Sequence, residues 1–280
     1  MNYSKKLIVT GLILLAVAWT VNVFYYNSRV LKEPLFLKHY YNINSGWSEF
    51  QLFYLQNINS AQNVVIISFP ELNKQYVPFV ETEWNSERIY YKMKNLRINM
   101  FNGKAEQIPA DLKNKVITKA EVHFSDGKTM TVDLGKIYLY SDTPDKKETV
   151  NLKNSGSTSS SDNTGSASFI AGRDIKILGL SFRFNEIVGD ALKFRINGQD
   201  YNDISLPMNI KANENVSIEY SFRLDKNDIR SSYVYSFPIE VLTEDSNGYR
   251  EKSTFQIINY WQQHSKGYNI KELLKAQGRE

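Results

Sequence analysis

The longest uninterrupted apolar segment of the chain lies near its N-terminal end. Residues 7–26 contain no charged side chain. A helix of twenty residues is about 30 Å long, which matches the hydrocarbon core of a bilayer. Within this segment, Ala16-Val17-Ala18 has the small-x-small form of a signal-peptidase site. The pattern therefore predicts either a retained membrane anchor or a signal peptide that is cleaved after Ala18.

The length of the apolar segment favours the retained anchor. A signal peptide ends its apolar region at the cleavage site, whereas here the apolar pattern continues beyond Ala18. Aromatic residues close the segment, as in an interfacial aromatic belt. The residues that we expect to hold the chain in the bilayer are Leu7, Leu12, Leu15, Trp19, Phe24, Tyr25 and Tyr26.

Charges flanking the segment give a weak preference for orientation. Lys5 and Lys6 precede it, and Arg29, Lys32 and Lys38 follow it, so the positive-inside rule is close to a tie. A short basic arm before an apolar segment is typical of an uncleaved export signal. We therefore expect a single-pass protein of the cell membrane, with the N-terminus inside and the bulk of the chain extracytoplasmic.

Strand patterns follow the apolar segment. Residues 49–55 are apolar nearly throughout, which predicts a strand covered on both faces, and residues 63–69 end at a proline. The clearest unit is a hairpin over residues 118–140. A three-residue turn that ends at Gly127 sets Val122 opposite Met130, which places the apolar side chains on one face. Gly127 is then expected at positive φ, in a bulge.

Five further strand patterns occupy residues 174–184, 192–201, 216–224, 233–242 and 250–258. Asn197-Gly198 predicts a tight hairpin turn, with Gly198 as its structural glycine. Short strands at this spacing indicate immunoglobulin-like sandwiches. The expected fold is all-β: an N-terminal transmembrane helix, two immunoglobulin-like β-sandwich domains and a short C-terminal helix.

Residues 154–168 contain only Asn, Ser, Gly, Thr, Asp and Ala. Such a composition predicts a flexible interdomain linker, or alternatively a long surface loop within one domain. At the C-terminal end, Asn269 followed by Glu272 predicts a capped amphipathic helix, which packs on the second domain or docks on a partner. The expected organisation is a cytoplasmic arm and anchor over 1–30, a membrane-proximal sandwich over 31–145, the linker over 146–168, a distal sandwich over 169–262 and a tail over 263–280.

Composition limits the class of function. The net charge of +4 comes from 34 basic and 30 acidic residues that are mixed along the chain. With no long basic run and no recognisable motif for binding RNA or DNA, nucleic acid is not an expected partner. The chain has no cysteine, which excludes a lipid-modified cysteine as the anchor.

The sequence singles out no catalytic, cofactor-binding or metal-binding residue. His39, His123 and His264 have no histidine or cysteine at ligand spacing, and His123 falls on the polar face of its strand. An acidic pair of glycosidase type could still assemble in space. The doublets Tyr40-Tyr41 and Tyr90-Tyr91 are candidates for a carbohydrate platform, although neighbours in a strand point to opposite faces.

These observations lead to one main hypothesis and two alternatives. The layout resembles that of surface-anchored bacterial proteins with immunoglobulin-like modules, a resemblance of architecture alone. The main hypothesis is a non-catalytic, membrane-anchored extracytoplasmic binding or assembly protein, whose distal domain binds a protein or cell-wall partner. The alternatives are an enzyme acting on cell wall or glycan through a carboxylate pair, and a sensor that relays through a membrane partner.

Overall fold

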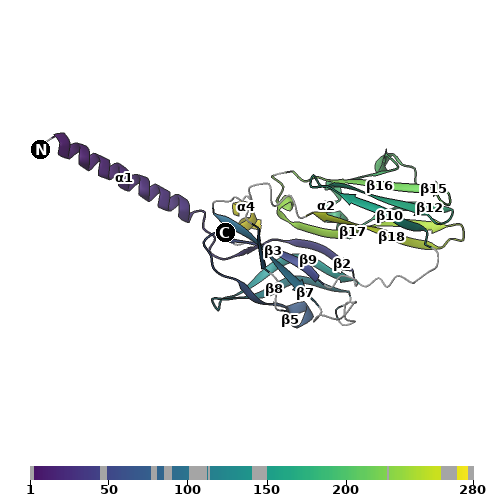
Figure 1. Ribbon diagram of the computed structural model, residues 1–280, viewed down its shortest axis with the longest axis horizontal. Coiled ribbons are helices and arrows are strands. Elements are labelled where there is room, and N and C mark those ends of the chain that lie inside the picture. Colours follow the sequence, from purple (N-terminus) through teal and green to yellow (C-terminus); the bar gives the residue numbers. More distant parts are fainter. Residues whose placement is uncertain are drawn as a thin grey trace.

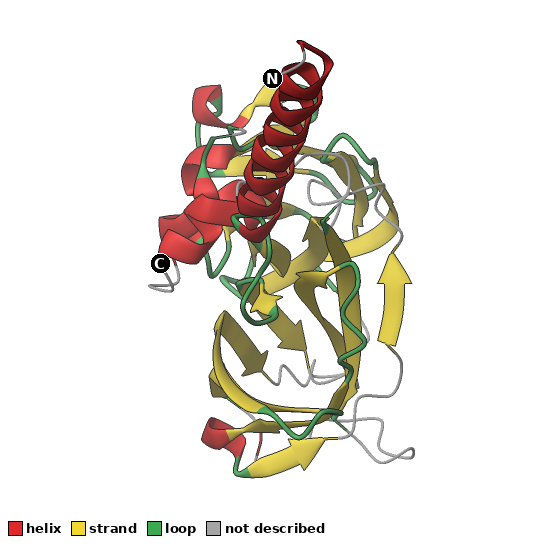
Figure 2. Cartoon of the chain, turned by 90° about the vertical axis from the view of Figure 1, so that its left-hand side faces the viewer, coloured by secondary structure: helices red, strands yellow, loops and turns green. Residues whose placement is uncertain are grey.

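A computed structural model of the protein describes residues 3–44, 49–76, 81–84, 90–100, 112, 114–140, 150–225, 227–259 and 270–276. Helix α1 (Tyr3–Asn27) extends from one end of a body of strands in Figure 1. Figure 2 shows that strands make up most of this body. The expectation of an all-β fold with an N-terminal apolar helix is confirmed.

Helix α1 is long and apolar enough over Lys5–Asn27 to cross a membrane, and the described chain buries none of it. Among its exposed side chains are all seven residues that the sequence assigns to the anchor. A helix that is apolar on every side and uncovered is typical of a membrane span or a signal sequence.

The first half of the body consists of two facing layers of strands. One is a four-stranded sheet in the order β1 (Leu35–Phe36), β3 (Glu49–Asn57), β7 (Tyr91–Asn99) and β6 (Glu81–Trp84). The other contains β2 (His39–Asn44), β9 (Thr129–Tyr140), β8 (Lys115–Phe124), β4 (Val64–Phe69) and β5 (Lys74–Tyr76). A 3-10 turn, η1 (Pro70–Leu72), follows β4. Residues 52–55 of β3 are at most 1% exposed, as expected for a strand covered on both faces.

The hairpin of β8 and β9 has the register that one-face burial requires. Val122 pairs with Met130 and Ala120 with Val132. Gly127 has a φ of 82°, and its N–H donates to the carbonyl oxygen of Phe124 at 3.0 Å. The apolar side chains of this hairpin therefore enter the first hydrophobic core.

The second half has the same layered form. Its five-stranded sheet has the order β10 (Leu152–Ser159), β11 (Thr164–Ala171), β16 (Asn215–Phe222), β13 (Leu192–Ile196) and β14 (Gln199–Asp200). The opposite layer contains β15 (Met208–Ile210), β12 (Ile175–Ser181), β17 (Val234–Asp245) and β18 (Arg250–Asn259). The short elements are α2 (Asn185–Val188), η3 (Gly189–Ala191), η4 (Tyr201–Asp203) and η5 (Ile229–Ser232). At the β13–β14 turn, Asn197 and Gly198 have φ values of 50° and 81°.

The prediction of a flexible linker is wrong for the described residues of that segment. Strands β10 and β11 form a hairpin that pairs from Leu152 with Ala171 to Ser159 with Gly165. Strand β11 lies inside the sheet between β10 and β16, and it inserts Ala167, Phe169 and Ala171 into the core. Backbone hydrogen bonds to β11 hold β10 at the sheet edge, where its small polar side chains are exposed. Residues 146–149 lie outside the described part of the chain.

One sheet runs through both halves. Strand β17 pairs with β2 in parallel, from Val234 with His39 to Ser236 with Tyr41, and β2 continues in parallel with β9. Residues 240–245 of β17 pair with β12, and β18 occupies the other edge of β17 along its length. β2 and β12 therefore share one edge of β17, and the halves are joined by backbone hydrogen bonds.

Tyr40 and Tyr41 connect the two hydrophobic cores across this junction. Tyr41 is buried in the first core, and its Oη donates to the carbonyl oxygen of Gln51 at 2.8 Å. Tyr40 packs against the second core, with its ring stacked on that of Tyr235 at a centroid distance of 5.7 Å. Because neighbours in a strand point to opposite faces, Tyr41 packs in the first core and Tyr40 packs against the second core.

The C-terminal helix lies against the first core, whereas the sequence pattern predicts that it packs on the second domain. In α4 (Ile270–Ala276), Leu273 is 1% exposed and belongs to the first core, and Leu274 packs against that core. Ile229 of η5 also packs there, because the chain enters β17 beside β2. Asn269, the expected cap, lies outside the described residues.

Candidate functional site

The five-stranded sheet of the second half has one face in the core and one face turned to solvent. In β16, Val216, Ile218, Tyr220 and Phe222 are buried, and the intervening Ser217, Glu219 and Ser221 lie on the outer face. In β13 the same alternation exposes its basic residues. The period of two in the sequence therefore sends the polar side chains of neighbouring strands to the same surface.

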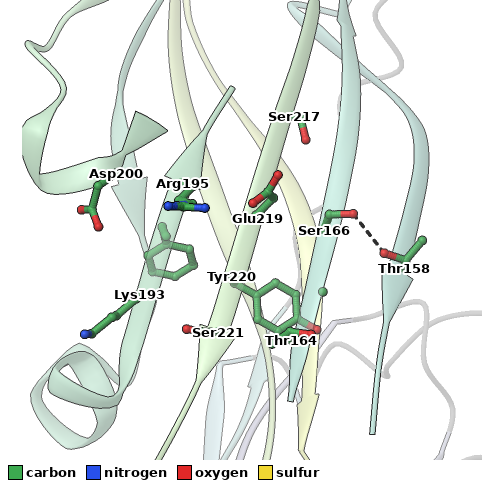
Figure 3. Close-up of a pocket in the computed structure, with 12 residues that line it drawn as sticks. Thr158, Thr164, Ser166, Lys193, Arg195, Asp200, Ser217, Glu219, Tyr220 and Ser221 are labelled. Carbon is green, nitrogen blue, oxygen red and sulfur yellow. Dashed lines mark hydrogen bonds between the residues drawn. The ribbon is translucent and has the colours of Figure 1, made fainter. Parts of the chain in front are cut away.

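Strand register aligns these polar side chains across all five strands. Asp200 pairs with Arg195, Arg195 with Glu219, Glu219 with Ser166, and Ser166 with Thr158. We call these five residues the polar row. Figure 3 shows them side by side, with a hydrogen bond of 2.9 Å between Thr158 Oγ1 and Ser166 Oγ.

A second, shorter row lies beside the polar row. Lys193 pairs with Ser221, and Ser221 pairs with Thr164. Together with Ser217, the two rows line a surface groove of about 600 Å³, which we call the polar groove. Its outward-facing side chains comprise two cations, two carboxylates and five hydroxyl groups, so it offers hydrogen-bond donors and acceptors along its length.

A glycine lets the backbone and an aromatic ring come close beneath the groove. A Cβ on Gly165 would lie 2.5 Å from the carbonyl oxygen of Thr158 and 2.6 Å from Tyr220 Oη. The Tyr220 ring is buried on the core side, where it stacks on Phe255 at 6.1 Å. Burial raises the pKa of Tyr220, so its hydroxyl stays protonated at neutral pH.

The groove has the chemistry of a binding surface. The charged groups on this face are not held in ion pairs within the described part of the chain. This applies to Lys193, Arg195 and Glu219, although Arg195 and Glu219 are opposite each other in strand register. No group of three or more His, Asp or Glu side chains in the described ranges could hold a metal ion. No motif in the sequence marks these residues, although the alternation in LKFRI and VSIEYSF predicts that they face outward.

The predicted turn glycines lie away from the groove lining. Gly127 is in the first half, and Gly198 joins β13 to β14, where a Cβ would meet nothing within 4 Å. His123 lies on the outer side of β8, with its Nδ1 2.9 Å from Thr129 Oγ1, and His264 lies outside the described residues. Gly127 and Gly198 both have positive φ, so their role is to form the two hairpin turns.

His39 is fully buried beside the junction of the halves. Its Nε2 accepts a hydrogen bond from the Phe53 N–H at 2.9 Å, which assigns the ring proton to Nδ1. Burial lowers the pKa of His39 to about 3. The side chain is therefore a neutral structural acceptor at physiological pH.

Comparisons with known proteins give distant structural likenesses. No family model and no curated protein matches the chain. The archaellum periplasmic stator protein complex FlaF and FlaG from Sulfolobus acidocaldarius is 21% identical, with a TM-score of 0.21 over 41% of this chain and 97% of that one. A protein of unknown function from Porphyromonas gingivalis W83 is 10% identical, with a TM-score of 0.25 over 81% of this chain and 96% of that one.

A third solved structure is the SGBP-B protein of the Bacteroides ovatus mixed-linkage glucan utilization locus, in complex with a mixed-linkage heptasaccharide. It is 11% identical, with a TM-score of 0.23 over 77% of this chain and 42% of that one. At these identities and TM-scores the likenesses carry no argument about function, which must come from the groove and the helix themselves.

Proposed function

We propose that the chain is a non-catalytic, membrane-tethered extracytoplasmic protein that binds or assembles with a partner, and that the second half carries the main binding surface. In this proposal α1 is retained in the bilayer with its N-terminus inside. The polar groove is the contact surface for a protein or a cell-wall glycan.

The observation that carries the binding role is the polar row. Five strands from three stretches of the chain, residues 152–171, 192–200 and 215–222, bring hydrogen-bonding side chains into one line across the sheet. The opposite face of the sheet buries the apolar side chains of β13 and β16, so the polar row is the part of these strands that remains accessible to a partner. A polar, hollowed surface suits a partner rich in hydroxyl, amide or charged groups.

The uncovered α1 supports the membrane role. Its exposed side chains include Leu12 at 63% and Phe24 at 73%, which water would solvate poorly. A bilayer removes that cost over the whole circumference of the helix. N-terminal sequencing of protein from purified membranes should find residues upstream of Lys5. Soluble protein that begins at Trp19 would refute the retained anchor.

Photo-crosslinking in intact cells tests the binding surface. A crosslinking amino acid at Ser221 lies in the groove, and a control at Lys176 lies on β12 of the opposite layer. We expect adducts from position 221 that are reduced by Arg195→Ala, and none from position 176. Adducts that form equally at both positions, or at position 176 alone, would overturn the assignment of the groove.

A further inference from the structure

The end of α1 is attached to the first half by specific hydrogen bonds. Asn57, the last residue of β3, holds the backbone of Leu31 in both directions: its Oδ1 accepts from Leu31 N at 2.9 Å, and its Nδ2 donates to Leu31 O at 2.8 Å. Tyr91 at the start of β7 donates its hydroxyl to the carbonyl oxygen of Arg29. These bonds hold the body against the end of the helix.

Aromatic rings extend this attachment around the helix. The ring of Tyr90 lies 6.4 Å from that of Tyr25 and 6.2 Å from that of Tyr26, between ring centroids. The Arg29 guanidinium lies 5.2 Å from the centroid of the Tyr25 ring. Since Tyr25 and Tyr26 end the apolar segment, the Tyr90 ring of the body lies within about one helical turn of the end of that segment.

This level corresponds to the membrane interface when α1 spans the bilayer. The interfacial layer on each side of the hydrocarbon core is roughly 5–7 Å thick. Tyr25 and Tyr26 fall at the edge of the core, where tyrosine is enriched. A ring about 6 Å from both of them therefore lies in or beside the headgroup layer.

Exposed apolar side chains are found at the same level. The N–H of Ile58 donates to the carbonyl oxygen of Tyr90 at 2.9 Å, so the backbones of these two residues are adjacent. Ile58 is 44% exposed, and Val30 after the helix is 39% exposed. We call Val30, Ile58 and Tyr90 the interfacial patch.

We propose that the interfacial patch is a lipid-contacting surface, by which the first half rests in the headgroup layer around the end of α1. The loop after β3 inserts Ile58 among the lipids, and Tyr90 joins the aromatic belt of the helix. The body is then held at a fixed orientation on the membrane. This inference rests on the retained anchor of the proposed function.

The absence of cysteine from the chain makes a site-specific test simple. Three variants, Ile58→Cys, Ile170→Cys and Leu15→Cys, are labelled with an environment-sensitive fluorophore and placed as full-length protein in lipid nanodiscs. Ile170 is a matched control because it is also isoleucine, is 37% exposed and lies on β11 of the second half. Two quenchers are used in separate samples: a phospholipid that carries a nitroxide near its headgroup reports on positions 58 and 170, and a phospholipid that carries a nitroxide near the end of its acyl chain reports on position 15, which lies in the interior of the bilayer.

We expect the label at position 58 to lose about half of its fluorescence, because it lies within the headgroup layer. The label at position 170 should keep its intensity. Quenching at position 15 with no quenching at position 58 beyond that at 170 would overturn the interfacial patch while leaving the anchor intact. An absence of quenching at position 15 as well would overturn the anchor.

Discussion

Replacing Gly135 by alanine tests the close packing of the strands that join the two halves. Gly135 on β9 pairs with His39 on β2, and His39 pairs with Val234 on β17. Gly135 has a φ of 86°, and a Cβ there would lie 2.7 Å from the carbonyl oxygen of His39 and 3.0 Å from its nitrogen. The alanine side chain therefore conflicts with the backbone of β2.

Gly127 supplies a matched control, since its φ is 82° and a Cβ there would meet nothing within 4 Å. Placing alanine at positive φ costs about 1–2 kcal/mol of unfolding free energy, and this cost is common to both sites. Overpacking against a fixed neighbour adds about 1–3 kcal/mol. We expect Gly127→Ala to lose about 1–2 kcal/mol and Gly135→Ala about 2–5 kcal/mol.

Urea denaturation of the full-length chain in detergent micelles, followed by far-ultraviolet circular dichroism, measures both losses. The midpoint should fall further for Gly135→Ala than for Gly127→Ala. Equal losses for the two variants would refute the close approach of β9 to β2.

Three other predictions follow from buried groups. Burial lowers the pKa of His39 from 6.5 to about 3. Between these two values the unfolded chain binds a proton at His39 and the folded chain does not, so the contribution of neutral His39 to stability is lost as pH falls from about 6.5 toward 3. The loss is at most ~1.4 kcal/mol per pH unit. His39→Gln should flatten the pH dependence of the urea midpoint in this range; an unchanged slope would contradict the assignment. Gly165→Ala should displace the Tyr220 ring and lower the melting temperature, and near-ultraviolet circular dichroism that stays unchanged would count against this. Leu273→Ala should cost about 2–5 kcal/mol and Leu274→Ala less, whereas a neutral Leu273→Ala would show that α4 is not part of the first core.

The sequence predicts those features that depend on local periodicity. The register of the β8–β9 hairpin follows from one-face burial, because a shift by one residue would turn Val122 and Met130 to opposite faces. The helix α1 follows from its length and apolar composition. In both cases the information lies within about 25 consecutive residues.

Two kinds of feature were not predicted: the β10–β11 hairpin, whose edge strand lacks a clear apolar pattern, and features that depend on pairing between distant strands. Strand β10 lacks apolar alternation because it is an edge strand with exposed side chains, and Ala167, Phe169 and Ala171 of β11 were the available signal for the hairpin. The polar groove requires the register between β13, β16 and β11, which the outward positions of Arg195 and Glu219 do not specify by themselves.

The parallel pairing of β2 with β17 also dictates the order in which the chain can fold. Residues 39–41 obtain their partners from residues 234–236, about 195 positions later, and Leu273 contributes to the first core. During synthesis from the N-terminal end, this edge of β2 stays unpaired until β17 has been made. A chain that is truncated after the first half would keep that edge unpaired, which makes it a target for aggregation or proteolysis. Pairing of β2 with β17 therefore becomes possible only after residues 234–236 have been synthesised.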